Sequence, residues 1–178
     1  MAKNILRKKF SNAIICQNND HKIIDNAVSL IEKYHPRIVG IYIAQKEEID
    51  LMPIMLKFQK TTFVVPKITF ENDAEQLFFT NYYLGASLEP NEKYINYLEP
   101  ASDKIIIPNL IFVPAIAFDM KGYRLGRGKG HYDKYLVEHT AIKIGVCRGS
   151  NLLTRLPTES HDIKMDHIIT EDMILNLI

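Results

Sequence analysis

Apolar residues recur along this chain with two spacings, and the change from one to the other divides it into helices and strands. Near the amino terminus they recur every three or four residues, which is typical of an amphipathic helix. Further on they form short continuous runs rich in β-branched residues, which favour buried strands. This pattern predicts helices at 4–15, 21–34, 53–60 and 131–138, and strands at 37–44, 61–65, 110–113, 142–147 and 166–169.

The order of these segments predicts the fold class. Strands alternate with helical segments, as in proteins whose helices cover a mostly parallel sheet. We therefore expect an α/β fold, a three-layer sandwich in which a mostly parallel open sheet carries helices on both faces. No repeat, low-complexity tract or linker interrupts the sequence, so residues 1–178 are expected to form a single domain.

Three local features complete the expected architecture. Asp20 is in position to be the N-cap of the helix that follows it. The segment 68–84 has little periodicity, apart from a possible short strand at 81–84. Residues 114–130 contain glycines and charges without a usable period and are expected to form a long loop. Long loops in compact domains are usually functional or disordered.

Composition narrows the range of partners. The chain is 47% apolar, which is enough for a sizeable core, and its 22 basic and 21 acidic residues argue against a nucleic-acid binder. The apolar stretch 105–118 is too short to cross a bilayer, and no signal-peptide run follows the basic start. Cys16 and Cys147 have no metal-site spacing and are expected to be buried thiols in a reducing compartment. We expect a cytoplasmic monomer without nucleic-acid or membrane partners.

The most informative segment, 124–133, reads RLGRGKGHYD and leads into a predicted helix. Gly126, Gly128 and Gly130 allow positive φ angles and bring bare backbone N–H groups close to an anion. Open α/β sheets bind ligands at the carboxyl ends of strands, and a helix N-terminus favours an anion there. The segment predicts a phosphate site, with a flexible glycine turn as the alternative. It matches neither a Walker A loop nor the dinucleotide-binding pattern.

Four Lys or Arg and no acidic residue lie between positions 121 and 131. Arg124 can bind phosphate bidentately, whereas Arg127 and Lys129 add positive charge that can neutralise a transferring phosphoryl group. We expect Arg124 and Lys129 to carry the catalytic roles.

Acidic residues near this segment need a separate explanation. A carboxylate beside bound phosphate is repulsive unless a cation lies between them, so Asp133 suggests Mg²⁺, although it could instead complement the helix dipole. Asp162 could be a second Mg²⁺ ligand, whereas His161 fits a surface or capping role as well as a catalytic one. Glu47 or Glu48, after the first predicted strand, could accept hydrogen bonds from a heterocyclic amine. A solvated acidic helix start is the alternative for these two residues.

The sequence VPAIAFD at 113–119, followed by Gly122 and by 124–133, resembles the signature of the 5-formyltetrahydrofolate cyclo-ligases, also called methenyltetrahydrofolate synthetases. Weaker similarity extends over nearly the whole chain. The resemblance implies an enzyme that uses ATP and Mg²⁺ to convert 5-formyltetrahydrofolate into 5,10-methenyltetrahydrofolate, with release of ADP and phosphate. Because the formyl oxygen is a poor leaving group, its phosphorylation would let N10 close the ring. The protein would then act by positioning and electrostatics, without an enzyme nucleophile.

The resemblance also implies roles for individual residues. Lys3 and Arg7 would reach the nucleotide phosphates, and Glu48 would hold the pterin with Ile43 packed nearby. Asp133 and Asp162 match the positions of the metal ligands. The ATP-binding segment would comprise Arg124, Gly126, Arg127, Gly128, Lys129, Gly130, His131 and Tyr132, of which Arg127, Gly128, Lys129, Gly130 and His131 would also border the folate.

Four positions depart from the family pattern. His131 stands where Tyr is usual, Arg148 and Asn151 stand in place of Phe and Gln, and Ala115 replaces a Gly. None of these changes removes a phosphate or metal group, so activity is expected to survive. Two other functions stay open. One is a folate- or nucleotide-binding homologue without turnover, and the other, from fold analogy alone, is a sugar-phosphate isomerase-like enzyme that needs no ATP.

Overall fold

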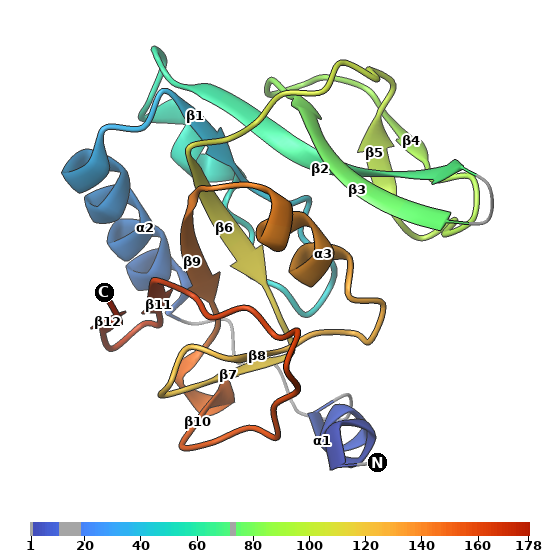
Figure 1. Cartoon of the computed structure of the whole chain (residues 1–178). Helices are drawn as coiled ribbons and strands as arrows, with labels where there is room; N and C mark the ends of the chain where they lie inside the picture. Colours follow the sequence, from blue (N-terminus) through green and yellow to red (C-terminus); the bar gives the residue numbers. More distant parts are fainter. Residues whose placement is uncertain (1, 11–18, 72–73) are drawn as a thin grey trace.

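The computed structural model of the protein describes residues 2–10, 19–71 and 74–178 (Figure 1). Within these residues the central feature is a seven-stranded sheet, in which the inner strands run parallel and each edge strand is antiparallel to its neighbour. The order is β12 (Ile174–Asn176), β11 (His167–Ile169), β9 (Ile142–Val146), β6 (Leu110–Pro114), β1 (Ile38–Gly40), β2 (Thr62–Glu71) and β3 (Ala74–Asn81).

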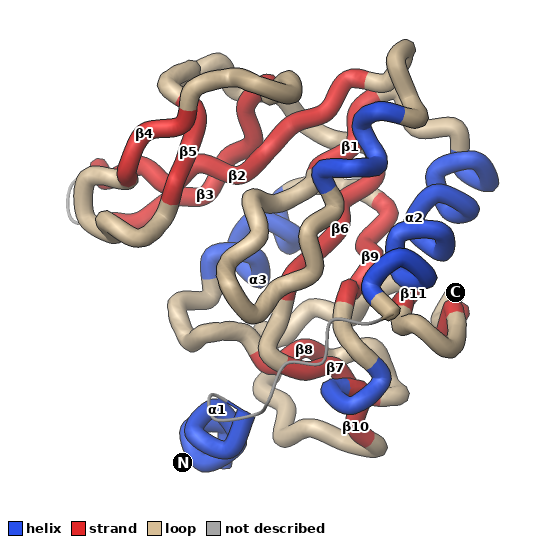
Figure 2. The backbone as a smooth tube through the Cα atoms, turned by 180° about the vertical axis from the view of Figure 1, so that it is seen from behind, coloured by secondary structure: helices blue, strands red, loops and turns tan. Residues whose placement is uncertain are grey.

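Helices cover both faces of this sheet. Successive side chains of β6 alternate between the two faces, because residues of a strand point to opposite sides in turn. Leu110 and Phe112 belong to the hydrophobic cluster that includes α2 (Asp20–Tyr34), whereas Ile111 and Val113 belong to the cluster that includes α3 (His131–Glu138). All four side chains are fully buried. Figures 1 and 2 show the two helices on opposite sides, which confirms the three-layer α/β sandwich.

The helices differ from the prediction mainly at their ends. The first helix, α1, spans Ala2–Phe10, and its expected end at residue 15 lies outside the described residues. The predicted cap of α2 is wrong, because Asn19 occupies the N-cap position and Asp20 is the first helical residue. The Asp20 carboxylate instead accepts hydrogen bonds from Arg148 at 2.7 and 3.0 Å, an ion pair that competes with capping.

The segment predicted as a helix at 53–60 forms only a 3-10 turn, η1 (Met52–Leu56). Pro53 suits the start of either kind of helix, so the proline could not distinguish them. The helix predicted at 131–138 is confirmed as α3.

The largest error concerns residues 62–100. β2 runs well beyond the predicted strand and pairs with β3 over eight residues of each strand. The prediction that 68–84 is aperiodic, apart from a short strand at 81–84, is therefore wrong. The chain then forms an antiparallel pair, β4 (Leu88–Pro90) with β5 (Leu98–Pro100). These four strands, together with the connection between β4 and β5 at 91–97, are here called the β-arm, which extends beyond the helices (Figure 1). Exposure alternates along the first half of β3, a pattern of half-buried strands.

The expected long loop at 114–130 is wrong in part, because it contains two short strands. β7 (Ala117–Asp119) pairs antiparallel with β8 (Arg124–Leu125) and parallel with β10 (Leu152–Leu153), which follows the 3-10 turn η2 (Gly149–Asn151). The fully buried side chain of Asp119 stabilises the turn between β7 and β8. Its carboxylate accepts hydrogen bonds from the backbone N–H groups of Lys121, Tyr123 and Leu156.

Two expectations from composition can be compared with the structure. Cys147 is a buried free thiol, as expected, and burial raises its pKa to about 12, whereas Cys16 lies outside the described residues. None of the helices in the described ranges has the length and apolar character needed to span a membrane.

Candidate functional site

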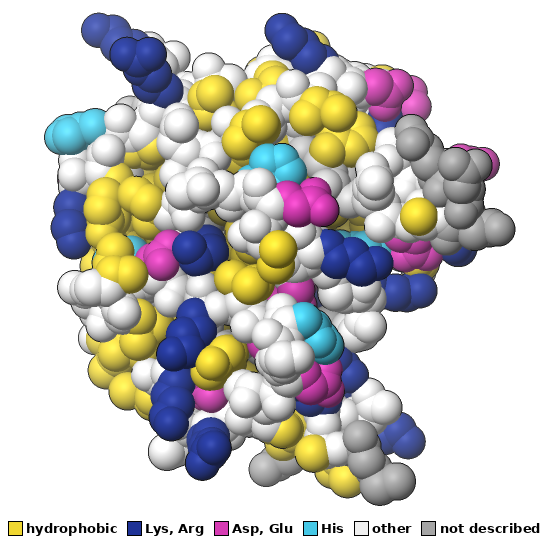
Figure 3. All heavy atoms as spheres, in the orientation of Figure 1, with side chains coloured by type: hydrophobic (Ala, Val, Ile, Leu, Met, Phe, Trp, Pro, Cys, Tyr) yellow, Lys and Arg dark blue, Asp and Glu magenta, His cyan; other side chains and the backbone are white. Residues whose placement is uncertain are grey.

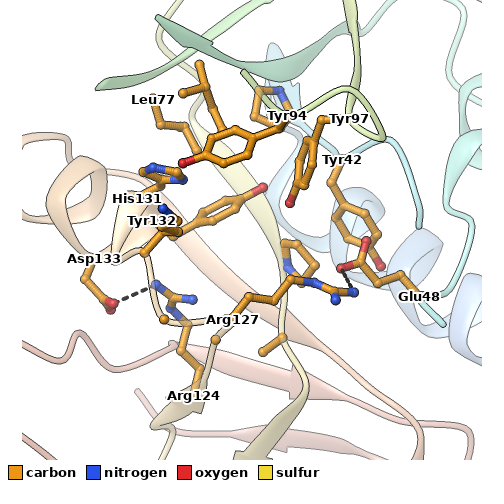
Figure 4. A pocket seen from close by; sticks show the side chains of 18 of the residues that line it. Tyr42, Glu48, Leu77, Tyr94, Tyr97, Arg124, Arg127, His131, Tyr132 and Asp133 are labelled. Atoms are coloured by element: carbon orange, nitrogen blue, oxygen red, sulfur yellow. Dashed lines mark hydrogen bonds and ion pairs between the residues drawn. The ribbon is translucent and has the colours of Figure 1, made fainter. Parts of the chain in front are cut away.

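The winding direction of the sheet reverses between its neighbouring strands β1 and β6. From β1 the chain continues to β2 on one side, and from β6 it continues to β9 on the other. Such a reversal opens a crevice at the carboxyl ends of parallel strands. A pocket of about 530 Å³ lies there, bounded by the signature loop (residues 124–132), the β-arm and α1. Figure 4 shows the side chains that the loop and the β-arm contribute to it. On the face seen in Figure 3, the surface is hollowed between the β-arm and α1, with charged side chains along its edge.

All the residues to which the family resemblance assigned a site role line this one pocket, although they come from four separate stretches of the chain. They are Lys3, Arg7, Ile43, Glu48, Arg124, Gly126, Arg127, Gly128, Lys129, Gly130, His131, Tyr132, Asp133 and Asp162.

The three glycines of the signature loop serve two different purposes. Gly128 and Gly130 have φ angles of 104° and 71°, the left-handed conformation that favours glycine. Gly126 does not have a positive φ, contrary to expectation. A Cβ atom there would lie 2.6 Å from a guanidinium nitrogen of Arg124, so the side chain of Arg124 requires the space. Gly130 is also the N-cap of α3, which places the helix N-terminus at the pocket.

Arg124 and Asp133 form a partly buried ion pair, with 2.7 Å between Nη2 and Oδ2 and side-chain exposures of 6% and 15%. Figure 4 shows the two side chains at the base of the pocket. Arg124 therefore places a positive charge directly beside the Asp133 carboxylate. Among the described residues, the Nε atom of Arg124 and the hydroxyl of Tyr132 are buried without a hydrogen-bond partner. Buried polar atoms are seldom left unpaired, so both atoms are suited to contact a ligand.

α1 contributes two cations to the same region. Lys3 Nζ lies 2.8 and 2.7 Å from the two carboxylate oxygens of Asp162, and Arg7 donates from Nε to the carbonyl of Gly126 at 2.8 Å. Partial burial acts to raise the pKa of Asp162, but hydrogen bonds from Lys3 and from the backbone N–H of Glu159 outweigh it and hold the pKa below its usual value.

Asp162 also belongs to a group of possible metal ligands. Its carboxylate and the side chains of Glu159 and His161 offer ligand atoms that lie within 4.8 Å of one another. His161 is mostly exposed and lies 3.2 Å from Glu159. Asp133 is not a member of this group, so the two predicted metal ligands are not brought together in it.

Glu48 lies on the opposite side of the pocket and faces Arg127 (Figure 4). Its carboxylate accepts a hydrogen bond from the backbone N–H of Gln45 at 3.0 Å and lies 3.5 Å from Arg127 Nη2. Burial raises the pKa of Glu48 despite these contacts. Glu47 is 55% exposed and Glu48 only 13%, so the structure places Glu48 rather than Glu47 in the crevice, and the solvated helix start is excluded.

The sequence did not reveal an aromatic wall contributed by the β-arm. Tyr94 and Tyr97 point into the pocket and face Tyr132 and Tyr42 across it (Figure 4). Burial raises the pKa of Tyr97, so its hydroxyl stays protonated. The two tyrosines lie three residues apart in a polar segment with no usable period. Only the folding of the β-arm over the signature loop brings them to the site.

The residues that depart from the family pattern support the pocket in different ways. Arg148 lies behind Glu48, where it pairs with Asp20 and donates to the carbonyl of Glu47 at 3.1 Å. Asn151 donates to the carbonyl of Ile116 at 2.7 Å. Ala115 lines the pocket itself.

Comparisons with known proteins identify the family of the chain. The model of the 5-formyltetrahydrofolate cyclo-ligase family matches residues 4–171. The 5-formyltetrahydrofolate cyclo-ligase of Mus musculus is 40% identical over 70 residues, a match that spans 36% of this chain and only 34% of that protein. The enzyme of the same name from Haemophilus influenzae is 25% identical over 176 residues, which cover 92% of each chain.

A solved structure matches over nearly the whole length. The NMR structure of Aquifex aeolicus 5,10-methenyltetrahydrofolate synthetase has a TM-score of 0.82 and 29% identity, and the match covers 99% of this chain and 93% of that one. The family match and this shared fold lead to one conclusion: the chain belongs to the 5-formyltetrahydrofolate cyclo-ligase family.

Proposed function

We propose that the protein is a 5-formyltetrahydrofolate cyclo-ligase, which converts 5-formyltetrahydrofolate into 5,10-methenyltetrahydrofolate at the expense of ATP. The observation that carries this proposal is the shared pocket. Phosphate-binding groups of the signature loop face a buried carboxylate and an aromatic wall across a cavity of about 530 Å³. The reaction needs both kinds of site next to each other, because a phosphoryl group must pass from nucleotide to folate.

The signature loop and α1 form the proposed nucleotide side. Lys3, Arg7, Arg124 and Lys129 would surround the triphosphate, with the amides from Gly126 to Tyr132 donating to its oxygens. The unpaired Nε of Arg124 and hydroxyl of Tyr132 support this assignment, since a phosphate oxygen can accept from either donor.

Glu48 and its neighbours form the proposed folate side. The buried carboxylate of Glu48 can accept hydrogen bonds from the N–H groups of a pterin, and Ile43 lies beside it in the pocket wall. The residues from Arg127 to His131 would border the folate from the loop. Apolar and aromatic walls with a few polar groups are typical of sites for flat heterocycles.

The chemistry follows from this placement. The formyl oxygen attacks the γ-phosphorus and ADP leaves. N10 then attacks the formyl carbon and a C–N bond forms. N10 gives up its proton to solvent, and the C–O bond breaks with release of phosphate. Arg124 and Lys129 would stabilise the charge that develops on the transferring group. The protein supplies alignment and charge, so no covalent enzyme intermediate is proposed.

Asp133 and Asp162 would hold Mg²⁺, and the donor set fits this ion. Both are carboxylates, and Asp162 has a second carboxylate, that of Glu159, close by. Arg124 and Lys3 already pair with Asp133 and Asp162, which suits an ion held largely by nucleotide phosphates rather than by the protein alone. When bound, Mg²⁺ supplies positive charge to the phosphate oxygens.

We further propose that the protein is a cytoplasmic monomer and has no nucleic-acid partners. The near balance of basic and acidic residues supports the absence of nucleic-acid partners, because nucleic-acid-binding proteins usually have a basic face. Light scattering in solution checks the monomer.

The test is a coupled assay with 5-formyltetrahydrofolate, ATP and Mg²⁺. We expect the absorbance of the methenyl product to rise together with ADP in a 1:1 ratio, and to depend on Mg²⁺. ATP binding without any product would favour a binding protein without turnover. Conversion that needs no ATP would favour the isomerase-like alternative.

A further inference from the structure

Glu75 of strand β3 lies beside the pocket without lining it and connects the β-arm to the signature loop. Its carboxylate accepts hydrogen bonds from three side chains: Lys93 Nζ at 2.9 Å, the Tyr94 hydroxyl at 2.7 Å and His131 Nε2 at 2.8 Å. Lys93 and Tyr94 belong to the β-arm, whereas His131 is the first residue of α3 and part of the signature loop. One carboxylate therefore joins two walls of the pocket.

The chemistry of these contacts makes them strong. Hydrogen bonds from Lys93, Tyr94 and His131 lower the pKa of Glu75 to about 2, so the group is ionised at physiological pH. An ionised carboxylate only accepts, so the Nε2 atom of His131 must carry the hydrogen. Hydrogen bonds to an ionised group are shorter and stronger than neutral ones.

Tyr94 provides a second connection to the same part of the loop. Its ring lies 6.5 Å from the ring of His131, and the Lys129 ammonium lies 5.2 Å from its ring centroid. Lys129 and His131 flank Gly130, where an added Cβ would meet no atom within 4 Å. The loop has little packing of its own at this point, so the contacts on either side of Gly130 hold it in place.

We propose that Glu75 is a positioning residue that docks residues 129–131 onto the β-arm. It does not touch ligand itself. It acts through His131 and Tyr94, and so fixes where Lys129 and the loop amides stand relative to the aromatic wall. The inference rests on the proposed function of the loop in binding the nucleotide and bordering the folate.

The first test needs no activity. Amide hydrogen exchange over residues 129–132 is compared, without ligand, in the wild type, Glu75→Ala, His131→Ala and the double variant. We expect faster exchange in each single variant and no further increase in the double variant, because both changes remove the same contact. Unchanged exchange in Glu75→Ala, or effects that simply add, would overturn the proposal.

The second test measures the consequence for turnover. For Glu75→Ala we expect kcat to fall about 10-fold, because Lys129 is no longer held in place against the transferring group, and KM for ATP and folate to rise by a similar factor, the effect of losing a charged hydrogen bond. His131→Gln keeps an N–H donor and should recover part of the loss seen in His131→Ala. Unchanged kcat and KM in Glu75→Ala, or no recovery by Gln, would contradict the proposal.

Asp103→Ala is the matched control, since it removes the 2.7 Å ion pair with Lys67 on the same β-arm. That variant should leave loop exchange and KM unchanged. If Glu75→Ala does not fold, Glu75→Gln replaces it. We then expect smaller changes in loop exchange and in the kinetic constants, in the same direction. If the wild type shows no turnover but the loop exchanges faster in Glu75→Ala, the proposed function is refuted and the positioning role stands. If the wild type is active but loop exchange is the same in Glu75→Ala, the positioning role is refuted and the proposed function stands.

Discussion

At the scale of single residues, the acidic groups around the proposed phosphate site are already neutralised by cations. Asp133 pairs with Arg124 and Asp162 with Lys3. Lys129 differs from Arg124 and Lys3, because it is exposed and its ammonium lies over the ring of Tyr94. The hydroxyl of Tyr94 and the charge of Glu75 raise the pKa of Lys129, so its ammonium stays charged and available to a phosphoryl group.

Replacing Lys129 by Ala should lower kcat by roughly 10²-fold, as for the loss of one preorganised donor to a transition state. Because the side chain is exposed, the midpoint of thermal unfolding should not change. Turnover and thermal melting are measured side by side. Lys134→Ala, an exposed lysine change in α3 outside the pocket, is the control and should leave both unchanged. Near-normal turnover in Lys129→Ala would show that Lys129 has no catalytic role.

Burial of Glu48 predicts a pH dependence of stability. Since its pKa is raised in the folded state, the native protein holds this proton more tightly than the unfolded chain does. The resulting stability is complete below the unfolded pKa of about 4.3 and is lost as pH rises through the folded value. Glu48→Gln cannot ionise, so its free energy of unfolding should improve relative to wild type as pH rises above the unfolded pKa of about 4.3, and the improvement should stop growing once pH exceeds the raised folded pKa.

Urea denaturation at several pH values measures this difference. Glu47→Gln, which removes the exposed neighbouring carboxylate, is the control. A difference between Glu48→Gln and wild type that does not vary with pH would show that the raised pKa has no effect on folding.

At the scale of elements, α1 completes the pocket although it begins the chain. Leu6 and Phe10 pack against the cluster of Ala117, Leu125 and Leu156, under the strands that carry the signature loop. This packing directs Lys3 and Arg7 into the site. The amphipathic spacing predicted the helix, but its place beside the loop depends on contacts more than 100 residues away in sequence.

Lys3→Ala tests the contribution of this helix. We expect KM for ATP to rise about 10-fold, because the variant loses a partly buried cation that would reach the nucleotide phosphates. Steady-state kinetics with varied ATP provide the measurement. Ile5→Ala changes a mostly exposed side chain of the same helix and should behave as wild type. Equal KM values in the two variants would mean that α1 takes no part in nucleotide binding.

The β-arm shows where prediction from sequence failed. β6 and β9 are buried on both faces, so their continuous apolar runs were identified correctly. β3, β4 and β5 are short or half-exposed, and their pairing depends on each other rather than on a local pattern. Tyr94 and Tyr97 were missed for the same reason, and so was Glu75, whose three partners lie on two segments, the β-arm and the signature loop.

At the scale of the whole molecule, the pocket exists only when distant parts of the chain meet. α1, the segment after β1, the β-arm and the signature loop each supply one wall. A ligand that binds there should stabilise the native state and not the unfolded chain, since no single segment retains the site.

A non-hydrolysable ATP analogue with Mg²⁺, at 100 times its dissociation constant, should therefore raise the free energy of unfolding by about 2.7 kcal/mol. Chemical denaturation with and without the analogue measures the gain. The same experiment on Lys3→Ala at a fixed analogue concentration should show a smaller gain. Absence of any stabilisation in the wild type at saturating analogue would place the nucleotide elsewhere.

The sequence by itself determined the α/β class, the principal strands and helices, and the signature segment with its glycines and cations. These features are local, because side-chain spacing and glycine conformation depend on neighbours along the chain. Only the tertiary structure decided that Arg124 is the cation beside Asp133, that Glu48 rather than Glu47 enters the crevice, and that tyrosines of the β-arm close the pocket. Such pairings depend on distances between segments far apart in sequence, and no local pattern contains them.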